Sequence, residues 1–274
     1  MPTSTGALVT GAGGGLGAQI AALLAQRGHQ VHVTDVDLAA AEATAQRIGN
    51  GAFASLLDVR DDEATRAAAA TTVERTGRLA VWVNNAGVLL TGPAWQQTAE
   101  QRRLMLEVNS LGLMNGTIAA INTMTGSGGG HIVNIVSLAG LVAVPGEAVY
   151  AGSKHAALGF SLSTQTDLRL AGIKDIDISC LCPDGIWTPM LFDKLEDEQA
   201  ALSFSGRLLQ PEEVVAAVAK VLDRPRQVTA VPHWRGAQVR LADSLPGLSL
   251  RALPLVVGQA RRAQRKYARK LSKP

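Results

Sequence analysis

Short apolar runs alternate along this chain with longer amphipathic segments. Seven such runs span residues 7–10, 30–35, 52–59, 79–84, 131–137, 175–181 and 227–231. Most of them are continuous in Val, Ile, Leu and Ala, as is typical of strands covered on both faces of a sheet. Six segments repeat apolar residues at the helical period, over residues 16–28, 37–49, 61–76, 98–123, 147–171 and 211–223. The alternation predicts an α/β fold with right-handed crossovers, in which a doubly wound, mostly parallel sheet of about seven strands has helices on both faces.

Two stretches depart from this rhythm. Residues 184–210 form a long connection after the sixth strand, and connections of that length in compact domains are usually lids or binding loops. From about residue 244 the alternation stops. We therefore expect one large domain over residues 1–243 and a C-terminal extension over residues 244–274.

The charge of the chain is unevenly divided. The net charge is +3, but residues 1–243 carry −5, because they hold 18 of the 26 basic residues and all 23 acidic ones. The extension carries the remaining +8. This division excludes a nucleic-acid footprint over the whole body. Aromatic residues make up only 4% of the chain, which also disfavours base-stacking platforms.

The cysteines and histidines indicate neither a disulfide framework nor a metal site. Cys180 and Cys182 are the only cysteines, and two residues apart in a strand they share a face and cannot bridge each other. The five histidines lack metal-ligand spacing, so no metal is expected. A signal peptide and an uncharged apolar stretch of about 18 residues are both missing. These features favour a cytoplasmic protein.

A glycine-rich turn follows the first strand and opens the first helix. It reads Thr10-Gly11-Ala12-Gly13-Gly14-Gly15-Leu16-Gly17. Glycines at such a turn let the backbone approach a pyrophosphate, whose charge is met by free N–H groups and the helix dipole. The position of the turn predicts a Rossmann-like dinucleotide site.

Asp35 ends the second strand, 18 residues after Gly17. A carboxylate at this position can accept hydrogen bonds from both hydroxyls of an adenosine ribose and would repel a 2′-phosphate. Positions 14 and 36 hold Gly and Val, so neither supplies an Arg or Lys that would attract that phosphate. We therefore expect Asp35 and Val36 to contact NAD, with NADP disfavoured.

The TGxxxGxG spacing of the turn resembles that of the short-chain dehydrogenase/reductase family, and the resemblance extends over about residues 4–235. It includes Asn-Asn-Ala-Gly at residues 84–87 and the Tyr-x-x-x-Lys signature at residues 150–154. The resemblance implies cofactor contacts from Asp58, Val59, Asn85, Ala86 and Gly87. It also implies a catalytic domain over residues 1–243, with a catalytic set of Asn109, Ser137, Tyr150 and Lys154.

One motif departs from the family pattern. The family usually reads PGxxxT after the sixth strand, whereas residues 183–188 read Pro-Asp-Gly-Ile-Trp-Thr. The resemblance assigns cofactor contacts to Pro183, Asp184, Gly185, Ile186 and Thr188. Asp184 adds a carboxylate where the family has glycine, next to the expected position of the nicotinamide.

The catalytic set has a direct chemical rationale. Hydride transfer requires the cofactor to carry the hydride and the protein to move one proton. Lys154 lies four residues after Tyr150 and shares its helix face. Its ammonium, together with the cationic nicotinamide, is expected to lower the phenol's pKa from about 10 and make Tyr150 the general acid/base. Ser137 would polarise a carbonyl or stabilise a developing alkoxide. By resemblance, Lys154 also holds the nicotinamide ribose, and Asn109 holds a water that links Lys154 to solvent.

The substrate region is expected to be apolar. In the family, specificity comes from residues after Ser137 and after the sixth strand, which are here Leu138, Leu141, Val142, Trp187, Met190, Leu191 and Phe192. Apart from Lys154, residues 137–154 and 183–193 contain no Arg or Lys, so an anchor for a carboxylate or phosphate is missing. We expect an apolar secondary alcohol or ketone. An NADPH-dependent 3-oxoacyl thioester reductase and a non-catalytic NAD-binding regulatory protein stay open as alternatives.

The extension admits three interpretations. An apolar part, interrupted by Pro246 and Pro254, precedes a basic helical part whose one apolar face holds Ala260, Ala263, Tyr267 and Leu271. The helix could pack on the body or a neighbouring subunit, lie on an anionic membrane surface over residues 245–272, or form a nucleic-acid arm, the least favoured of the three. The resemblance separately implies a homodimer or homotetramer paired through the helices expected at 98–123 and 147–171.

Overall fold

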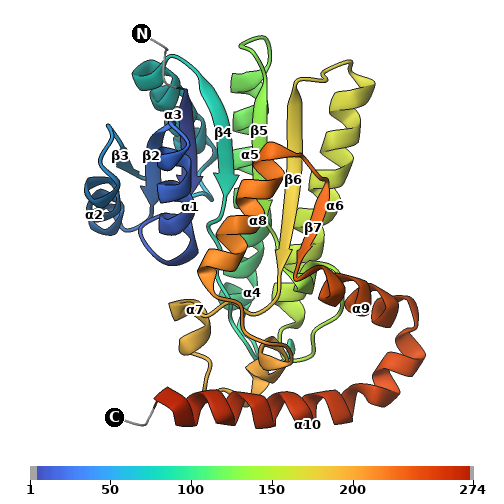
Figure 1. The fold of residues 1–274 in the computed structure, drawn as a ribbon. Helices are drawn as coiled ribbons and strands as arrows, with labels where there is room; N and C mark the ends of the chain where they lie inside the picture. Colours follow the sequence, from blue (N-terminus) through green and yellow to red (C-terminus); the bar gives the residue numbers. More distant parts are fainter. Residues whose placement is uncertain (1–4, 272–274) are drawn as a thin grey trace.

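A single sheet of seven parallel strands organises the protein (Figure 1). The computed structural model describes residues 5–271, and for residues 270 and 271 it describes the backbone alone. The strands are β1 (Gly6–Thr10), β2 (Gln30–Asp35), β3 (Phe53–Leu56), β4 (Leu79–Asn84), β5 (Gly130–Ile135), β6 (Ile176–Pro183) and β7 (Val228–Val231). Their order across the sheet is β3-β2-β1-β4-β5-β6-β7, with every neighbouring pair parallel. The predicted doubly wound α/β sheet is confirmed.

Helices cover both faces of the sheet, which explains why its strands are apolar on both sides. One face is covered by α1 (Gly15–Gln26), α2 (Leu38–Ile48) and α8 (Pro211–Asp223). The other is covered by α3 (Asp62–Thr76), α5 (Gly112–Met124) and α6 (Ala148–Leu170). Within β4, Val81 and Val83 belong to the first core and Trp82 to the second. Each central strand therefore contributes to two hydrophobic layers.

The strand order creates a switch point between β1 and β4. The chain builds outward from β1 through β2 to β3, and then returns to place β4 on the other side of β1. In open α/β sheets, ligands bind at such a point, outside the carboxyl ends of the strands. The glycine-rich turn after β1 and the turn that begins at Asn85 after β4 both lie at this edge.

The third strand is shorter than the expected 52–59. After Leu56 the chain leaves the sheet, and Val59 packs instead against α5. A Cβ atom on Gly112 would come within 2.5 Å of Val59 Cγ2, so the absence of a side chain on Gly112 permits this contact. The apolar residue Val59, at the end of the expected run, is buried against a helix and does not pair with a strand. A run of apolar residues looks the same in sequence in both cases.

The helix expected over 98–123 is interrupted in the middle. It consists of α4 (Ala99–Leu106), a π-helical turn η1 (Glu107–Leu111) and α5. π-Helical turns inside helices are rare and occur frequently at functional sites. The combined helix Ala99–Met124 is long and apolar enough to cross a membrane, but 56% of its most apolar window is buried inside the protein. Packing against the sheet and α6 accounts for this composition.

The extension and the residues before it form two helices, α9 (His233–Ser244) and α10 (Pro246–Leu271). The sequence pattern did not predict α9. The expected interruption of the extension at Pro254 is wrong, because α10 continues through this residue. Pro254 is exposed, so the backbone carbonyl that it leaves without a partner can be hydrated.

The inner face of α10 packs on the body, beneath the carboxyl ends of the strands (Figure 1). Its main partner is a 3₁₀ segment, η3 (Glu198–Phe204). Gln264 is buried, and its Nε2 donates to the carbonyls of Lys194 (2.8 Å) and Asp197 (2.7 Å). This face of the extension therefore packs on the body, as the first of the three interpretations expected. Leu271, predicted for the same face, lies outside the described side chains.

Candidate active site

A cavity of about 950 Å³ lies at the carboxyl edge of the sheet. It is continuous from the glycine-rich turn and Asp35, at the β1–β2 side, to Tyr150 on α6 and Leu191 on α7 (Pro189–Phe192). Most of the residues predicted to bind a cofactor line this one cavity. They are Gly11, Gly14, Gly15, Leu16, Gly17, Asp35, Val36, Asp58, Val59, Asn85, Ala86, Gly87, Tyr150, Lys154, Pro183, Asp184, Gly185, Ile186 and Thr188.

The glycine-rich turn brings bare backbone to the cavity. Gly11 has a φ of 61°, and a Cβ atom there would lie 2.7 Å from the Cα of Ala86. A Cβ on Gly17 would lie 2.2 Å from the carbonyl oxygen of Gly11, whereas one on Gly14 would meet nothing within 4 Å. No side chain caps the N-terminus of α1, and its first turn holds no acidic residue. The open space beside uncapped N–H groups fits a dinucleotide pyrophosphate.

Asp35 is fixed at the rim of this turn. Its Oδ2 accepts a hydrogen bond from the backbone N–H of Gly13 (2.8 Å), and its Oδ1 accepts one from Asp37 (3.1 Å). The side chain is half-buried and lines the cavity together with Val36. A carboxylate held there is suited to accept hydrogen bonds from ribose hydroxyls.

Two predicted cofactor residues, Thr10 and Gly13, are not among the residues that line the cavity. The buried Thr10 hydroxyl accepts hydrogen bonds from the backbone N–H groups of Asn85 (3.0 Å) and Ala86 (3.1 Å). It therefore connects the end of β1 to the turn after β4, while Gly13 holds Asp35. Thr10 and Gly13 therefore position residues that line the cavity and do not line it themselves.

Asp58 lines the cavity as an ion pair with Arg60, which the sequence analysis did not single out. Arg60 donates to both oxygens of the Asp58 carboxylate, with the shortest N–O distance at 2.5 Å. These hydrogen bonds are the main reason that the pKa of Asp58 lies below its usual value. Arg60 also lines the cavity, but the pairing with Asp58 offsets its charge.

Ser137 and Tyr150 meet at the other end of the cavity. Ser137 precedes the 3₁₀ turn η2 (Leu138–Gly140), and its Oγ accepts a hydrogen bond from the N–H of Ala139 (3.1 Å). Its hydroxyl lies close enough to the phenol of Tyr150 to act against the rise in the pKa of that phenol. The sequence places these two residues 13 positions apart, and the packing of η2 on α6 brings them together.

The pKa values of Tyr150 and Lys154 are shifted in the protein alone. Burial raises the pKa of Tyr150, and the charge of Glu147 raises it further. Burial also lowers the pKa of Lys154 to about 8. Loss of solvent disfavours both charged forms in the protein alone. The expected lowering of the pKa of Tyr150 also involves the cationic nicotinamide, so it stays a prediction for the cofactor-bound protein. The Lys154 Nζ lies 5.7 Å from the centre of the phenol ring.

Lys154 and Asn109 border the same gap. The buried Nζ of Lys154 donates to the carbonyl of Ile135 (3.2 Å). A Cβ on Gly87 would lie 3.2 Å from Asn109 Oδ1 and 3.7 Å from Lys154 Nζ, so the glycine keeps the space between the two side chains open. Asn109 itself lies in the π-helical turn η1 and forms two hydrogen bonds with the Val88 backbone, at 2.8 and 2.9 Å.

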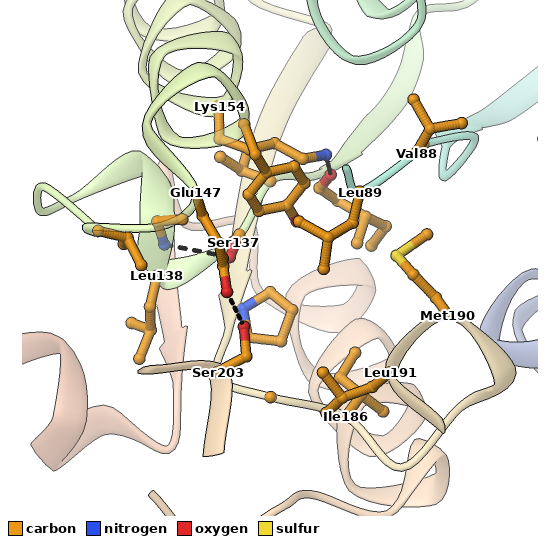
Figure 2. Close-up of a pocket in the computed structure, with 18 of the residues that line it drawn as sticks. Val88, Leu89, Ser137, Leu138, Glu147, Lys154, Ile186, Met190, Leu191 and Ser203 are labelled. Atoms are coloured by element: carbon orange, nitrogen blue, oxygen red, sulfur yellow. Dashed lines mark hydrogen bonds between the residues drawn. The ribbon is translucent and has the colours of Figure 1, made fainter. Parts of the chain in front are cut away.

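The apolar lining is only partly as predicted. Leu138, Val142, Met190 and Leu191 line the cavity, as Figure 2 shows for the three of them that it labels. Leu141, Trp187 and Phe192 do not line it.

The position of Trp187 and Phe192 is a correction to the predicted substrate residues. Their rings stack edge to face, with centroids 4.5 Å apart, and Trp187 also lies 5.6 Å from Tyr267 of α10. Together with Phe204 they form a cluster between α7, η3 and α10. The extension gives these side chains an apolar partner outside the cavity, and the sequence did not show that it would pack on this loop.

Comparison with known proteins agrees with this geometry. A family model described as short chain dehydrogenase matches residues 5–200. The chain belongs to the short-chain dehydrogenase/reductase family. It is 34% identical over 220 residues to cyclohexanol dehydrogenase of an Acinetobacter species, which covers 79% of this chain and 86% of that one.

Two further relatives extend the comparison. The chain is 34% identical over 224 residues to 2-(R)-hydroxypropyl-CoM dehydrogenase of Xanthobacter autotrophicus, with 79% and 88% of the two chains covered. The structure of the present chain resembles that of a short-chain dehydrogenase/reductase from Burkholderia phymatum in complex with NAD. The TM-score is 0.82 at 26% identity, over 90% of this chain and 95% of that one. The protein is thus an oxidoreductase of a family that includes alcohol dehydrogenases.

Asp184, the departure from the family's motif, has a local partner in this short-chain dehydrogenase. Its Oδ2 accepts a hydrogen bond from Arg235 Nε of α9 (2.7 Å), and the side chains are only 8% and 12% exposed. Arg235 also donates to Ser205 (2.9 Å) and Gln238 (2.7 Å). The added carboxylate therefore binds α9 to the loop after β6, and its charge is balanced within the protein.

Several cavity residues had no distinguishing signal in the sequence. The extension and α9 supply Arg235, Gln238, Val239, Ala242, Ser249, Ala252, Leu253 and Val256. Arg235 is a basic residue of the cavity that lies outside residues 137–154 and 183–193, the segments expected to form the substrate region. Its guanidinium is paired with Asp184. Glu147 and Ser203 also line the cavity, and Figure 2 shows the hydrogen bond between them. Glu147 lies three residues before Tyr150, so the sequence already places it near the phenol.

Proposed function

We propose that this protein is an NAD-preferring dehydrogenase that interconverts an apolar secondary alcohol and its ketone, with Tyr150 as the general acid/base. One observation carries the proposal. Ser137, Tyr150 and Lys154 share a single cavity with an uncapped glycine-rich turn and the Asp35 carboxylate. A dinucleotide held by the turn and Asp35 would extend along the cavity toward Tyr150.

The side chains have distinct roles in this reaction. A bound nicotinamide would exchange a hydride with the substrate carbon. In the oxidative direction, Tyr150 accepts the hydroxyl proton of the alcohol, and in the reductive direction it returns a proton to the carbonyl oxygen. Ser137 donates a hydrogen bond to that oxygen as negative charge develops on it. Lys154 would hold the ribose, and the gap beside Asn109 would hold a water that exchanges protons with solvent.

The preference for NAD rests on Asp35. Its carboxylate is fixed by Gly13 and Asp37 where a 2′-phosphate would come close to it. Arg60 is a basic side chain that lines the cavity, but it is already paired with Asp58 and so is less suited to bind a 2′-phosphate. The NAD-bound relative from Burkholderia phymatum supports the same choice.

The choice of substrate rests on the lining. Leu138, Met190 and Leu191 surround the space beyond Tyr150, and the names of two relatives record action on alcohols. A panel of apolar secondary alcohols with NAD and NADP, followed by absorbance of the reduced cofactor, tests the proposal. Turnover of alcohols with NAD is expected. Activity restricted to 3-oxoacyl thioesters with NADPH would overturn it, and NAD binding without any turnover would favour a regulatory protein.

The remaining proposals concern assembly and location. Pairing through α4–α5 and α6 would form a homodimer or homotetramer. The exposed outer face of α10, which carries Leu248, Leu255, Arg262 and Lys266, supports contact with an anionic membrane from a cytoplasmic protein.

A further inference from the structure

The reaction outlined above does not use Glu147, although its side chain lines the cavity. The residue is only 2% exposed. Its Oε1 accepts a hydrogen bond from the Ser203 hydroxyl at 2.6 Å (Figure 2). Within residues 5–271, no hydrogen bond reaches its other oxygen, Oε2. A carboxyl group therefore lines the cavity beside the catalytic phenol, with one oxygen that no described residue hydrogen-bonds.

Close backbone contacts hold this carboxyl and its partner in place. Gly146 has a φ of 86°, and a Cβ there would lie 2.2 Å from the carbonyl oxygen of Gln199 in η3. A Cβ on Gly185 would likewise lie 2.2 Å from the carbonyl oxygen of Ser203. The segment before α6, the loop after β6 and η3 therefore meet without intervening side chains. Glu147 and Ser203 are preorganised rather than free to turn toward solvent.

Apolar side chains contribute to the lining of the cavity that holds Glu147, among them Leu138, Val144, Leu191 and Leu202. Oε2 is not among the buried atoms that lack a partner, which fits an oxygen that faces the cavity. An apolar ligand that covered it would leave it unpaired at a cost in free energy, and a ligand that supplies a hydrogen bond avoids that cost. The unused oxygen thus marks a point at which a bound molecule should carry a polar group.

We propose that Glu147 and Ser203 form a second polar subsite, which binds a hydroxyl group of the substrate other than the one that reacts. The inference rests on the proposed dehydrogenase function and defines its substrate class as apolar diols or hydroxyketones. Glu147 is the N-cap residue of α6 and precedes Tyr150 by three residues, and both side chains line the same cavity. The second hydroxyl therefore lies in the same cavity as the reacting carbon, and diols that differ in the spacing of their hydroxyls sample the distance between the two.

A hydroxyl group suits this position better than a charged group. It donates a hydrogen bond to an ionised carboxylate and accepts one from a protonated carboxyl, so it matches both states of Glu147. Both states are accessible, because burial raises the pKa of Glu147 to about 7 and the nearby Asp197 adds to the rise. A carboxylate or phosphate would be repelled by the ionised form, while an ammonium would bind to that form alone.

Substrate discrimination tests the subsite. The probes are cyclohexanol and the cyclohexane-1,3- and 1,4-diols, each measured with NAD for kcat/KM, and by calorimetry for binding to the NAD-loaded protein. The wild type is expected to favour at least one diol over cyclohexanol by about tenfold, the usual worth of one hydrogen bond to a buried polar group. The ratio should fall by about tenfold in Glu147→Met/Ser203→Ala, which removes both partners and so avoids leaving a buried hydroxyl unpaired.

Matched variants isolate the effect. Val144→Ala removes only apolar lining and is expected to leave the ratio of diol to cyclohexanol unchanged. Ser203→Ala retains the carboxyl and should keep the diol preference. If the double variant is poorly folded, Glu147→Leu replaces it, with circular dichroism confirming a native spectrum.

The outcomes separate the two proposals. Oxidation of cyclohexanol without any diol preference, or a preference that the double variant retains, overturns the subsite and leaves the dehydrogenase function standing. Tighter binding of a diol without turnover, lost in the double variant, supports the subsite and overturns the function. A larger preference for 4-aminocyclohexanol than for the diols overturns the assignment of a hydroxyl.

Discussion

Tyr150 lies against Ser137 in a pocket whose burial opposes ionisation of the phenol. Removal of the hydroxyl tests whether this group nevertheless moves the proton. Tyr150→Phe is expected to lower kcat by about 10²–10⁴-fold, the usual contribution of general acid–base catalysis, while NAD affinity stays within a few-fold. Stopped-flow single turnover and calorimetric NAD titration measure the two quantities.

The chain offers a matched control for this variant. Tyr267 is the only other tyrosine, and its ring packs on Trp187 and Phe204 rather than lining the cavity. Tyr267→Phe should therefore retain normal turnover. Turnover in Tyr150→Phe equal to that of the control would remove Tyr150 from the catalytic role.

Asp35 provides a second test at the scale of one residue. In Asp35→Ala, the ribose loses its acceptor and a 2′-phosphate no longer meets a carboxylate. The ratio of kcat/KM for NAD to that for NADP is expected to fall by about 10–100-fold, equivalent to about 1.4–2.7 kcal/mol. Asp37→Ala is the control, because Asp37 lies two residues away and caps α2. An unchanged ratio in Asp35→Ala would contradict the preference for NAD.

Glu147 should make stability depend on pH. Burial raises its pKa from 4.5 to about 7 in the folded protein, so the folded state binds this proton more tightly than the unfolded state. Its favourable contribution is complete below pH 4.5 and is lost as the pH rises through about 7. Relative to Glu147→Gln, the wild type should therefore lose stability over this interval, by at most roughly 3 kcal/mol. Urea unfolding at pH 5, 6, 7 and 8 measures the difference, and parallel curves would contradict it.

Motif spacing could predict which residues meet in the cavity, but not how burial changes their pKa values. The positions of Ser137 and Tyr150 followed from a strand end and a helix, whose geometry is local. The direction of the pKa shift of Tyr150 depends on neighbours such as Glu147 and on loss of water. Trp187 was assigned to the substrate site because nothing in its own loop revealed that α10 would cover it.

At the scale of elements, α9 is connected to the loop after β6 by Arg235 and Asp184. Removal of the guanidinium leaves a nearly buried carboxylate without a cation, since Asp184 is 8% exposed. Arg235→Ala is expected to lower the free energy of unfolding by about 3 kcal/mol. Asp184→Gly/Arg235→Ala, which removes both charges, should be the more stable of the two, with a coupling energy of about 1–3 kcal/mol.

A double-mutant cycle by denaturant unfolding measures this coupling. The control is Arg66→Ala, which breaks the exposed pair of Arg66 and Asp62 on α3. Loss of that pair should change stability by less than about 0.5 kcal/mol. Additive effects of the Asp184 and Arg235 substitutions would show that the pair does not hold α9 in place.

Elements that bury apolar faces within the sheet were predictable, and those defined by tertiary contacts were not. The periodic segments of α1, α6 and α8 each follow or precede a strand and pack on it. By contrast, the π-helical turn around Asn109 has no periodic signature. Pro254 reads as a helix breaker in sequence, yet the helix continues where this residue faces solvent.

At the scale of the whole molecule, the structure shows where the basic extension lies relative to the acidic body. The body carries −5 and the extension +8, and α10 lies on the body beneath the carboxyl ends of the strands (Figure 1). Part of this charge is used internally, because Arg261 and Arg265 approach Glu198 at 3.3 and 3.5 Å. Arg262 and Lys266 lie on the exposed side of the helix. The inner face thus binds the enzyme body, and the outer face is available for an anionic surface.

Vesicle flotation tests the outer face while leaving the cavity intact, whereas truncation at Asp243 would also remove cavity-lining residues of α10. The full chain is expected to float with vesicles that contain phosphatidylserine and to remain below with phosphatidylcholine alone, and 0.5 M NaCl should weaken flotation because it screens exposed charges. Arg262→Glu/Lys266→Glu should abolish flotation. Arg66→Glu/Arg103→Glu makes the same change of charge on the body and should float normally, because the attraction depends on where the charge lies. Equal loss in both double variants, or no flotation of the wild type, would show that the extension serves the protein's own fold and not a membrane.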